Sequence, residues 1–297
     1  MTVAYPTAKR QAWLHDPTGA LADLPLDNPD AGWLCTELDL GFPATRDVVS
    51  NKPDQHGTDD RTRYFGARVV TIWVTAFLGG STAMDDIPGM FTAYMDPGKR
   101  PELHVIESSP TAQELVLVLR GSAYTGPLLY PMRIDMQLGF IAPDPALYGA
   151  TVQSATAWAG STIQGRVYPK AYPWTYPPGS QSAVTGIILS HGDLPVQPLL
   201  EVFGPATGAQ IGFDNGQYLV PFTSGSLINA GDYVTVDTKA KSAIRNSDGA
   251  SVLNWIDWSR VIWPVLAPNV SHVMSMTAIS PTGTTQVQAT WQDGYLA

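Results

Sequence analysis

The sequence predicts an all-β protein, built mainly from antiparallel strands with one short helix. Several segments alternate between apolar and other residues with a period of two, which places one face of a strand in a core. Glycine (27 residues) and proline (25 residues) are abundant and break long helices, so a helix bundle is disfavoured. Turn dipeptides such as Asn215-Gly216 separate short apolar runs, as they do in β-hairpins.

The strands are expected at five places in particular. Residues 69–77 and 115–119 are apolar on both faces, which is typical of strands that are covered on each side. Residues 132–140 and 287–291 alternate most regularly. The apolar members of these alternations are Met132, Ile134, Met136, Leu138, Phe140, Val287, Ala289 and Trp291. Residues 214–217 are expected to form the turn of a hairpin between residues 211–213 and 218–222.

A single helix is predicted at about residues 84–95. Ser81 is a candidate N-cap, and Pro88 is tolerated in a first turn. Apolar residues then recur at helical spacing, and Pro97-Gly98 ends the segment.

Two stretches are predicted to be irregular. Residues 41–62 carry Gly, Pro, Asn and charged residues throughout, and loops of this length are usually functional or disordered. Residues 143–182 are rich in Pro and Tyr, which favours a stiff connector without ladder hydrogen bonds. The predicted division is therefore a domain at residues 1–142, a connector at 143–182 and a second domain at 183–297.

Composition narrows the classes of function. The 297-residue chain has a formal net charge of −9, so it is a poor candidate for tight binding to nucleic-acid phosphates. The single cysteine, Cys35, excludes an internal disulfide framework and is expected to be a buried, unreactive thiol. No secretory signal precedes Lys9, and the apolar runs are shorter than the roughly 20 residues that cross a bilayer. We expect synthesis in the cytoplasm and no membrane insertion.

The sequence contains no pattern typical of catalysis or of cofactor binding. It lacks a G-x-S-x-G nucleophile turn, a P-loop and a G-x-G-x-x-G motif. The adjacent carboxylates Asp59-Asp60 and Asp85-Asp86 would point to opposite faces of a strand or lie at a helix start, which does not suit a glycosidase pair. The histidines have no zinc-site spacing; they are His15, His56, His104, His191 and His272. We therefore expect no enzyme, no cofactor and no metal.

A series of short motifs resembles, in order and spacing, the distal tail proteins of long-tailed phages, also called minor tail proteins. The first is residues 138–148, where an alternating strand closes and the chain continues into Asp144-Pro145-x-x-Tyr148. The Tyr- and Pro-rich residues 168–178, Gly192-Asp193 with the strand up to Gly204, residues 230–237, 263–269 and 287–291 follow. The residues with a structural role in this signature are Asp144, Pro145, Tyr148, Gly192, Asp193, Pro198, Gly231 and Asp232. Two departures are Asn269, where the family usually has Gly, and His191, where it tends to have Asn.

The resemblance implies a tail-tube-like first β domain that assembles into a sixfold ring around a DNA channel. It also implies a galectin-like second β-sandwich. The function that follows is a virion hub at the phage tail tip, with DNA passing through its bore without specific binding. The implied partners are further copies of the chain, the major tail tube protein, a tail-tip, baseplate or adhesion protein, and the tape measure protein.

The charged residues of the 41–62 loop are predicted to contact a neighbouring subunit or ring. They are Arg46, Asp47, Lys52, Asp54, His56, Asp59, Asp60 and Arg61. An alternative function is a carbohydrate-binding module that recognises host cell-wall glycans. It would use aromatic residues such as Trp255, Trp258 and Trp263 for stacking on sugar rings, although no His-Asn-Arg set accompanies them.

Overall fold

The computed structural model describes residues 11–46, 49–51, 58–60, 64–106, 114–130, 132–159, 183–279, 281 and 284–296. The chain divides into two compact units. The first unit comprises residues 1–150 and 295–297, and the second comprises residues 151–294. The chain therefore passes to the second unit after Ala150 and returns to the first at Tyr295.

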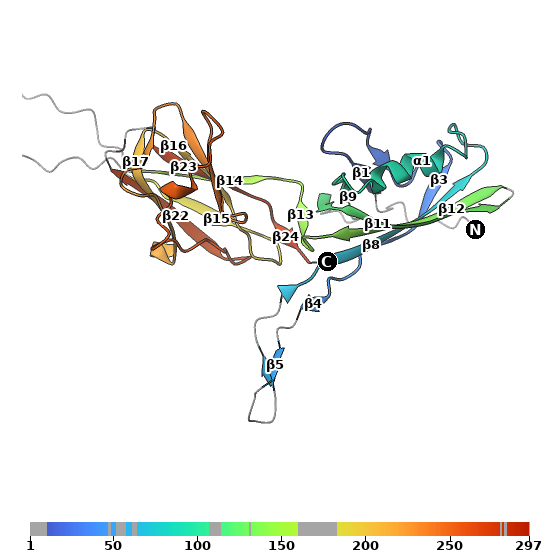
Figure 1. Ribbon diagram of the computed structural model, residues 1–297, viewed down its shortest axis with the longest axis horizontal. Coiled ribbons are helices and arrows are strands. Elements are labelled where there is room, and N and C mark those ends of the chain that lie inside the picture. Colours follow the sequence, from blue (N-terminus) through green and yellow to red (C-terminus); the bar gives the residue numbers. More distant parts are fainter. Residues whose placement is uncertain are drawn as a thin grey trace, which may run out of the picture. The chain divides into compact units, whose positions relative to one another are not determined.

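The first unit contains two sheets, shown with α1 in Figure 1. One has the order β2 (Leu24–Pro25), β1 (Gln11–His15), β9 (Glu102–Ile106), β10 (Glu114–Val118), β13 (Leu147–Gly149) and β24 (Gly294–Tyr295). The other has the order β11 (Arg120–Tyr130), β12 (Arg133–Ala142), β8 (Arg68–Phe77) and β3 (Trp33–Asp39). We call the second of these the four-stranded sheet.

The core of the first unit is formed by the inward faces of its strands and by the helix. Val70, Ile72, Val74 and Ala76 of β8 are buried, as are the alternating residues 134–142 of β12. The predicted alternation of residues 132–140 is thereby confirmed from Ile134 onward. Met132 itself precedes the strand and is exposed.

The helix is shorter than predicted. α1 (Ile87–Thr92) is followed by one turn of 3-10 helix, η1 (Ala93–Met95), so residues 84–86 lie outside it. Asp86 is at the N-cap position without a capping side-chain bond, and Pro88 lies in the first turn. Ser81 is therefore not the cap. Proline fixes the backbone at the helix start and makes the later beginning favourable.

Two short ribbons lie between β3 and β8. β4 (Thr45–Arg46) pairs with β7 (Tyr64–Phe65), and β5 (Val49–Asn51) pairs with β6 (Thr58–Asp60). We call the segment from Gly41 to Phe65 the arm (Figure 1). The prediction of an irregular loop was wrong for these strands, because polar residues at the described positions pair as antiparallel ribbons.

The second unit is a pair of sheets around its own core. One sheet has the order β14 (Gln153–Trp158), β23 (Gln286–Trp291), β16 (Leu199–Phe203), β20 (Tyr233–Asp237) and β21 (Ser242–Arg245). The other has the order β15 (Gly186–Leu189), β22 (Ser271–Ile279), β17 (Ala206–Phe213) and β18 (Tyr218–Pro221), with β19 (Leu227–Ile228) also paired to β17. Two 3-10 turns complete it, η2 (Asp214–Gly216) and η3 (Leu253–Trp255). The predicted hairpin is confirmed, with Phe213 paired to Tyr218. Val287, Ala289 and Trp291 are buried as predicted.

The division between the units differs from the predicted connector at residues 143–182. Residues 147–149 form β13 in the first unit, and residues 153–158 form β14 in the second. The dense run of Tyr and Pro begins only at Tyr168, so the residues before it remain free to pair in sheets. Residues 160–182 lie outside the described residues.

Two predictions of complete coverage were wrong. Val69 of β8 is 60% exposed and Val118 of β10 is 41% exposed, so each strand keeps one face open in the single chain. Cys35 on β3 is half-buried rather than buried, and its Sγ donates to the carbonyl oxygen of Glu37 at 3.3 Å.

Candidate assembly interface

The outward face of the four-stranded sheet carries mixed polar and apolar side chains. On β8 this face presents Val69, Thr71, Trp73, Thr75 and Phe77, which alternate with the buried residues of the core. No described element of the first unit forms a layer over this face. It is therefore an open sheet surface among the described residues of this unit.

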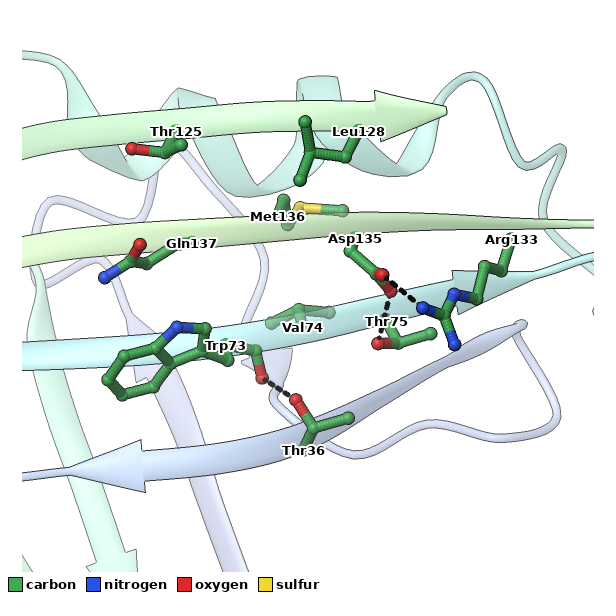
Figure 2. A pocket seen from close by; sticks show the side chains of 10 residues that line it. All are labelled: Thr36, Trp73, Val74, Thr75, Thr125, Leu128, Arg133, Asp135, Met136 and Gln137. Atoms are coloured by element: carbon green, nitrogen blue, oxygen red, sulfur yellow. Dashed lines mark hydrogen bonds and ion pairs between the residues drawn. The ribbon is translucent and has the colours of Figure 1, made fainter. Parts of the chain in front are cut away.

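A hollow of about 430 Å³ lies on this face (Figure 2). It is lined by Thr36, Trp73, Val74, Thr75, Thr125, Leu128, Arg133, Asp135, Met136 and Gln137. Trp73 lies opposite Gln137 in the antiparallel register, and Thr75 lies opposite Asp135. Cross-strand neighbours on one face lie within contact distance, so this register builds the hollow.

The charges of the hollow are paired with one another. The Thr75 hydroxyl donates to Asp135 Oδ1 at 2.8 Å, and Arg133 Nη2 lies 3.0 Å from Asp135 Oδ2. Figure 2 shows both interactions along β12 and β8. The partly exposed Arg133–Asp135 pair contributes little to stability. Its chemical consequence is that this arginine does not present an isolated positive charge to solvent.

The two edges of the four-stranded sheet are β11 and β3, and neither has a second strand partner within the described residues. The first half of β3 is blocked, since the Cys35 N–H donates to Asp27 Oδ1 at 2.8 Å. A bulge follows between Cys35 and Glu37. The regular part of this edge that remains is Glu37 to Asp39, where all three residues pair with β8 on their other side.

The base of the arm is an exposed apolar cluster. The Phe42 and Phe65 rings are in edge contact, with their centroids 6.1 Å apart, and Phe42 is 63% exposed. The Gly66 N–H donates to the Ala44 carbonyl oxygen at 2.7 Å, which extends the β4–β7 pairing toward β8. These two rings form an apolar surface where the arm leaves the sheet.

The predicted arm residues are only partly within the described structure. Arg46 lies on β4, while Asp59 and Asp60 lie on β6 and pair with Ser50 and Val49. The remainder lie outside the described residues: Asp47, Lys52, Asp54, His56 and Arg61. Their role in assembly stays a prediction.

The signature residues of the first unit form a turn. Asp144 Oδ1 accepts from the Ala146 N–H at 3.2 Å, and Asp144 Oδ2 accepts from the Tyr148 hydroxyl at 2.8 Å. The Pro145 carbonyl oxygen accepts from Arg68 Nε at 3.0 Å. This turn directs the chain from β12 into β13.

The Gly192-Asp193 turn lies against the last strand of the chain. The Asp193 N–H donates to the Gly294 carbonyl oxygen at 2.8 Å. A Cβ at Gly192 would meet that same oxygen at 2.2 Å, so only glycine fits. Asn269, where the family usually has Gly, has φ of 58° and donates through Nδ2 to the Gly192 carbonyl oxygen at 3.1 Å.

The other signature residues also fix backbone. The Pro198 carbonyl oxygen accepts from the Thr238 hydroxyl at 2.7 Å. Gly231 has φ of 80° in the turn before β20, and Asp232 accepts from the N–H and the hydroxyl of Ser247 at 3.1 and 2.8 Å. The signature positions therefore lie in separate turns and do not converge on a single site.

Of the described histidines that contact carboxylates, His15 and His104 lie together in the first unit, with ring centroids 5.5 Å apart, and His272 lies in the second unit. His15 Nδ1 is 2.6 Å from Asp23, His104 Nδ1 is 2.6 Å from Glu114, and His272 Nδ1 is 2.5 Å from Asp214. Within the described ranges, no group of three or more His, Cys, Asp or Glu side chains is placed to hold a metal ion. No helix in the same ranges has the length and apolar character to span a membrane.

Two features of this region have no motif in the sequence. Trp73 could have been placed on an open face only if the coverage of β8 had been known, because the strand is apolar on both sides. Arg68 is 1% exposed. From the sequence alone, an arginine close to the charged 41–62 loop would be expected on the surface. A period-two reading from Val70 onward does place residue 68 on the buried face.

No family model matches the sequence, and no curated protein matches it. Solved structures do match. SPP1 Dit (gp 19.1), described as a paradigm of the hub adsorption apparatus in phages that infect Gram-positive bacteria, is 13% identical with a TM-score of 0.61, over 96% of this chain and 99% of that one. A chain of the phage P2 baseplate in its activated conformation with Ca is 12% identical, with a TM-score of 0.52, over 96% and 98%. The corresponding structure with Sr is 13% identical, with a TM-score of 0.51, over 95% of this chain and 98% of that one. The chain thus has the all-β fold of phage tail hub and baseplate proteins.

Proposed function

We propose that the protein is a structural component of the tail tip of a long-tailed phage. It forms a ring, of six copies, that joins the tail tube to the baseplate or adhesion apparatus around the DNA channel. The observation that carries this proposal is the fold shared with SPP1 Dit over 96% of this chain and 99% of the other, since Dit is described as a hub. In this proposal the first unit is the tube-like, ring-forming domain, and the second is a galectin-like sandwich.

The edges of the four-stranded sheet support ring formation. β3 and β11 are different strands on opposite edges, so contact between successive copies is heterologous and can close into a ring. Closure also hides edges that otherwise promote aggregation. Because Asp27 occupies the edge at Cys35, pairing with the neighbour is expected along Glu37 to Asp39.

The open face of the four-stranded sheet suits the wall of a DNA channel. Its exposed and half-buried charged residues are three acidic and two basic, namely Glu37, Asp39, Asp135, Arg120 and Arg133. Arg133 is paired with Asp135 at 3.0 Å. A surface with a slight acidic excess and with threonine hydroxyls repels phosphate weakly and does not retain DNA.

The arm supports contact with a neighbouring subunit. The exposed Phe42 and Phe65 rings at its base would be covered by the next copy or by an adjacent ring. The partners in this proposal are the major tail tube protein on one side and a tail-tip or adhesion protein on the other. The tape measure protein would end at the ring.

The test is the composition and symmetry of virions. Antibody labelling of purified phage is expected to place the protein at the tail tip. Native mass spectrometry of the protein, alone and with tail tube protein, is expected to give a closed ring of six copies. Absence from assembled virions, or turnover of a substrate by the purified protein, would overturn the proposal.

One observation favours a second candidate, glycan binding by the second unit. Trp258 is 53% exposed and leans on Trp263, with ring centroids 5.9 Å apart, and an exposed indole can stack on a sugar ring. A glycan array with the intact protein and Trp258→Ala tests it. Saturable binding that the variant loses supports this candidate, and equal signals from both proteins oppose it.

A further inference from the structure

Arg68 is a cation enclosed within the first unit. Its side chain is 1% exposed, and burial lowers the pKa of its guanidinium. Nε donates to the Pro145 carbonyl oxygen at 3.0 Å, and Nη1 donates to the Gly41 carbonyl oxygen at 3.3 Å. Nη2 donates to the Leu296 carbonyl oxygen. All three acceptors are neutral backbone groups.

The three acceptors belong to segments that are far apart in sequence. Gly41 begins the arm, Pro145 lies in the turn between β12 and β13, and Leu296 follows the return of the chain from the second unit. Arg68 itself is the first residue of β8, directly after the arm. The guanidinium thus joins the start of the arm, the exit toward the second unit and the return from it.

Burying a charge is costly, and a buried arginine is not required to fill this space. An apolar side chain of similar volume would remove the buried charge but would leave the three carbonyl oxygens without their donor, which is costly. What the planar guanidinium supplies is several donors in fixed directions, which a flexible ammonium or a thioether cannot reproduce. The fixed directions of the donors, rather than the charge, therefore explain why position 68 is an arginine.

The Gly41 carbonyl group is held against β8 by its hydrogen bond from Arg68. Gly41 has φ of 60°, and a Cβ at this position would meet the Val69 carbonyl oxygen at 2.2 Å. The start of the arm therefore lies directly against β8, where Arg68 holds its carbonyl group. A displacement of Gly41 from β8 would release the arm from one side.

We infer that Arg68 is the positioning residue of the assembly arm. It fixes the start of the arm and the C-terminal segment to one point of the four-stranded sheet, so that loosening one loosens the other. The role of the arm in assembly rests on the proposed function. The coupling between the two segments is a property of the single chain and does not depend on ring formation.

Amide hydrogen exchange of the full-length protein tests the coupling. Arg68→Met is expected to accelerate exchange about tenfold in two separate segments, residues 41–46 with 64–67 and residues 294–296, while the β8 core stays protected. Arg68→Lys is expected to accelerate exchange across the whole first unit, because it leaves a buried charge with fewer bonds. Arg68→Gln keeps one amide donor group and is expected to loosen both segments to a smaller degree. It replaces Arg68→Met in the test if that variant does not fold.

The matched controls separate the outcomes. Arg120→Met removes an exposed arginine from the same sheet and is expected to leave exchange unchanged. Gly41→Ala displaces the start of the arm from β8 and, through the shared Arg68 guanidinium, is expected to accelerate exchange at residues 294–296 as well, by a smaller factor. Parental exchange in Arg68→Met or Arg68→Gln, or a uniform rise over the first unit in both, would overturn the inference. If exchange changes as expected and no protein is found in virions, the coupling stands and the hub proposal fails.

Discussion

The two units differ in the hydrogen bonds that hold their loops and chain segments against the sheets. In the second unit, the turns are closed by hydrogen bonds spread over separate places. Asp232 accepts from Ser247, and Asp214 accepts from the Val273 N–H at 2.9 Å while it pairs with His272. In the first unit, the buried Arg68 joins segments more than 200 residues apart, and the outward faces of β8 and β10 remain open. Both units carry exposed apolar side chains, such as Val69 in the first and Ile187 in the second, but the first holds distant parts of its chain together through a buried arginine.

This difference indicates where each kind of mutation acts. A change in a turn of the second unit affects stability, because each turn is closed by a particular hydrogen bond or close approach. Under the proposed function, a change on the open face or in the arm of the first unit is expected to affect assembly, because those residues contribute little to the core.

Removing the arm is expected to abolish ring formation and leave the fold intact. Ala44 and Gly66 are already joined by a 2.7 Å hydrogen bond, so deleting residues 45–65 and linking these two residues requires little rearrangement. The variant should elute as a folded monomer with parental circular dichroism. Native mass spectrometry in the presence of tail tube protein measures the loss of rings.

A smaller deletion of residues 44–60 provides a comparison for the same prediction. It removes β5, β6 and β4 but keeps β7, and should also fail to form rings. Ring formation by either deletion variant would show that the arm is dispensable for assembly. The contrast between the units would then rest on the sheet edges alone.

Gly192→Ala is expected to destabilise the second unit by roughly 3 kcal/mol. Its new Cβ would fall 2.2 Å from the Gly294 carbonyl oxygen, which belongs to backbone and cannot move aside cheaply. Urea unfolding monitored by tryptophan fluorescence measures the effect. The matched control is Gly225→Ala, where a Cβ meets nothing within 4 Å and stability should stay close to parental. Equal midpoints for the two variants would contradict this account of the turn.

Asp214→Asn is expected to weaken the second unit in a pH-dependent way. Burial raises the pKa of the Asp214 carboxyl, but hydrogen bonds from His272 and the Val273 N–H outweigh burial and lower it below its usual value of 3.8. A lowered folded-state pKa gives stability that is present above pH 3.8 and is lost as pH falls through the folded-state pKa. The variant should therefore lose roughly 1–3 kcal/mol at pH 7, and the gap to the parent should narrow in acid.

Urea unfolding at pH 7 and at pH 3 measures both parts of this prediction. Asp257→Asn is a useful control, since that carboxyl also has a lowered pKa but is held mainly by the Ser259 hydroxyl in an exposed turn. If the difference in unfolding free energy between Asp214→Asn and the parent is the same at both pH values, the negative charge of the carboxylate does not contribute to stability.

Much of the fold could be predicted from local sequence pattern, and the interface could not. The alternation at residues 134–140 and 287–291 and the Asn215-Gly216 turn carry their structure locally, so the strands and the hairpin were confirmed. The open face of β8 could not be identified, because Val69, Trp73 and Phe77 are apolar whether they meet a core or a partner subunit. The strands of the arm were not predicted either, because their polar residues show no periodic pattern. Arg68 was missed because its three partners are backbone carbonyl groups, which leave no trace in side-chain motifs.

The smallest expected effect concerns the charge of the proposed channel wall. Glu37 and Asp39 lie at exposed positions of β3, on the regular part of the sheet edge. In phage that carry Glu37→Lys and Asp39→Lys, each ring would gain 24 units of positive charge if it has six copies. Those cations would attract the passing phosphates, so DNA ejection should slow several-fold at low ionic strength.

Salt and a neutral variant decide whether charge is the cause. The slowing should fade as ionic strength rises, since the screening length falls from about 30 Å at 0.01 M to about 10 Å at 0.1 M. Glu37→Gln with Asp39→Asn alters the same positions without adding cations and should eject DNA almost at the parental rate. If that neutral variant slows ejection as strongly as the lysine variant, the side chains act through contact between subunits at the β3 edge. The open face would then be an adhesive surface like the arm, and the channel would have to be lined by other residues.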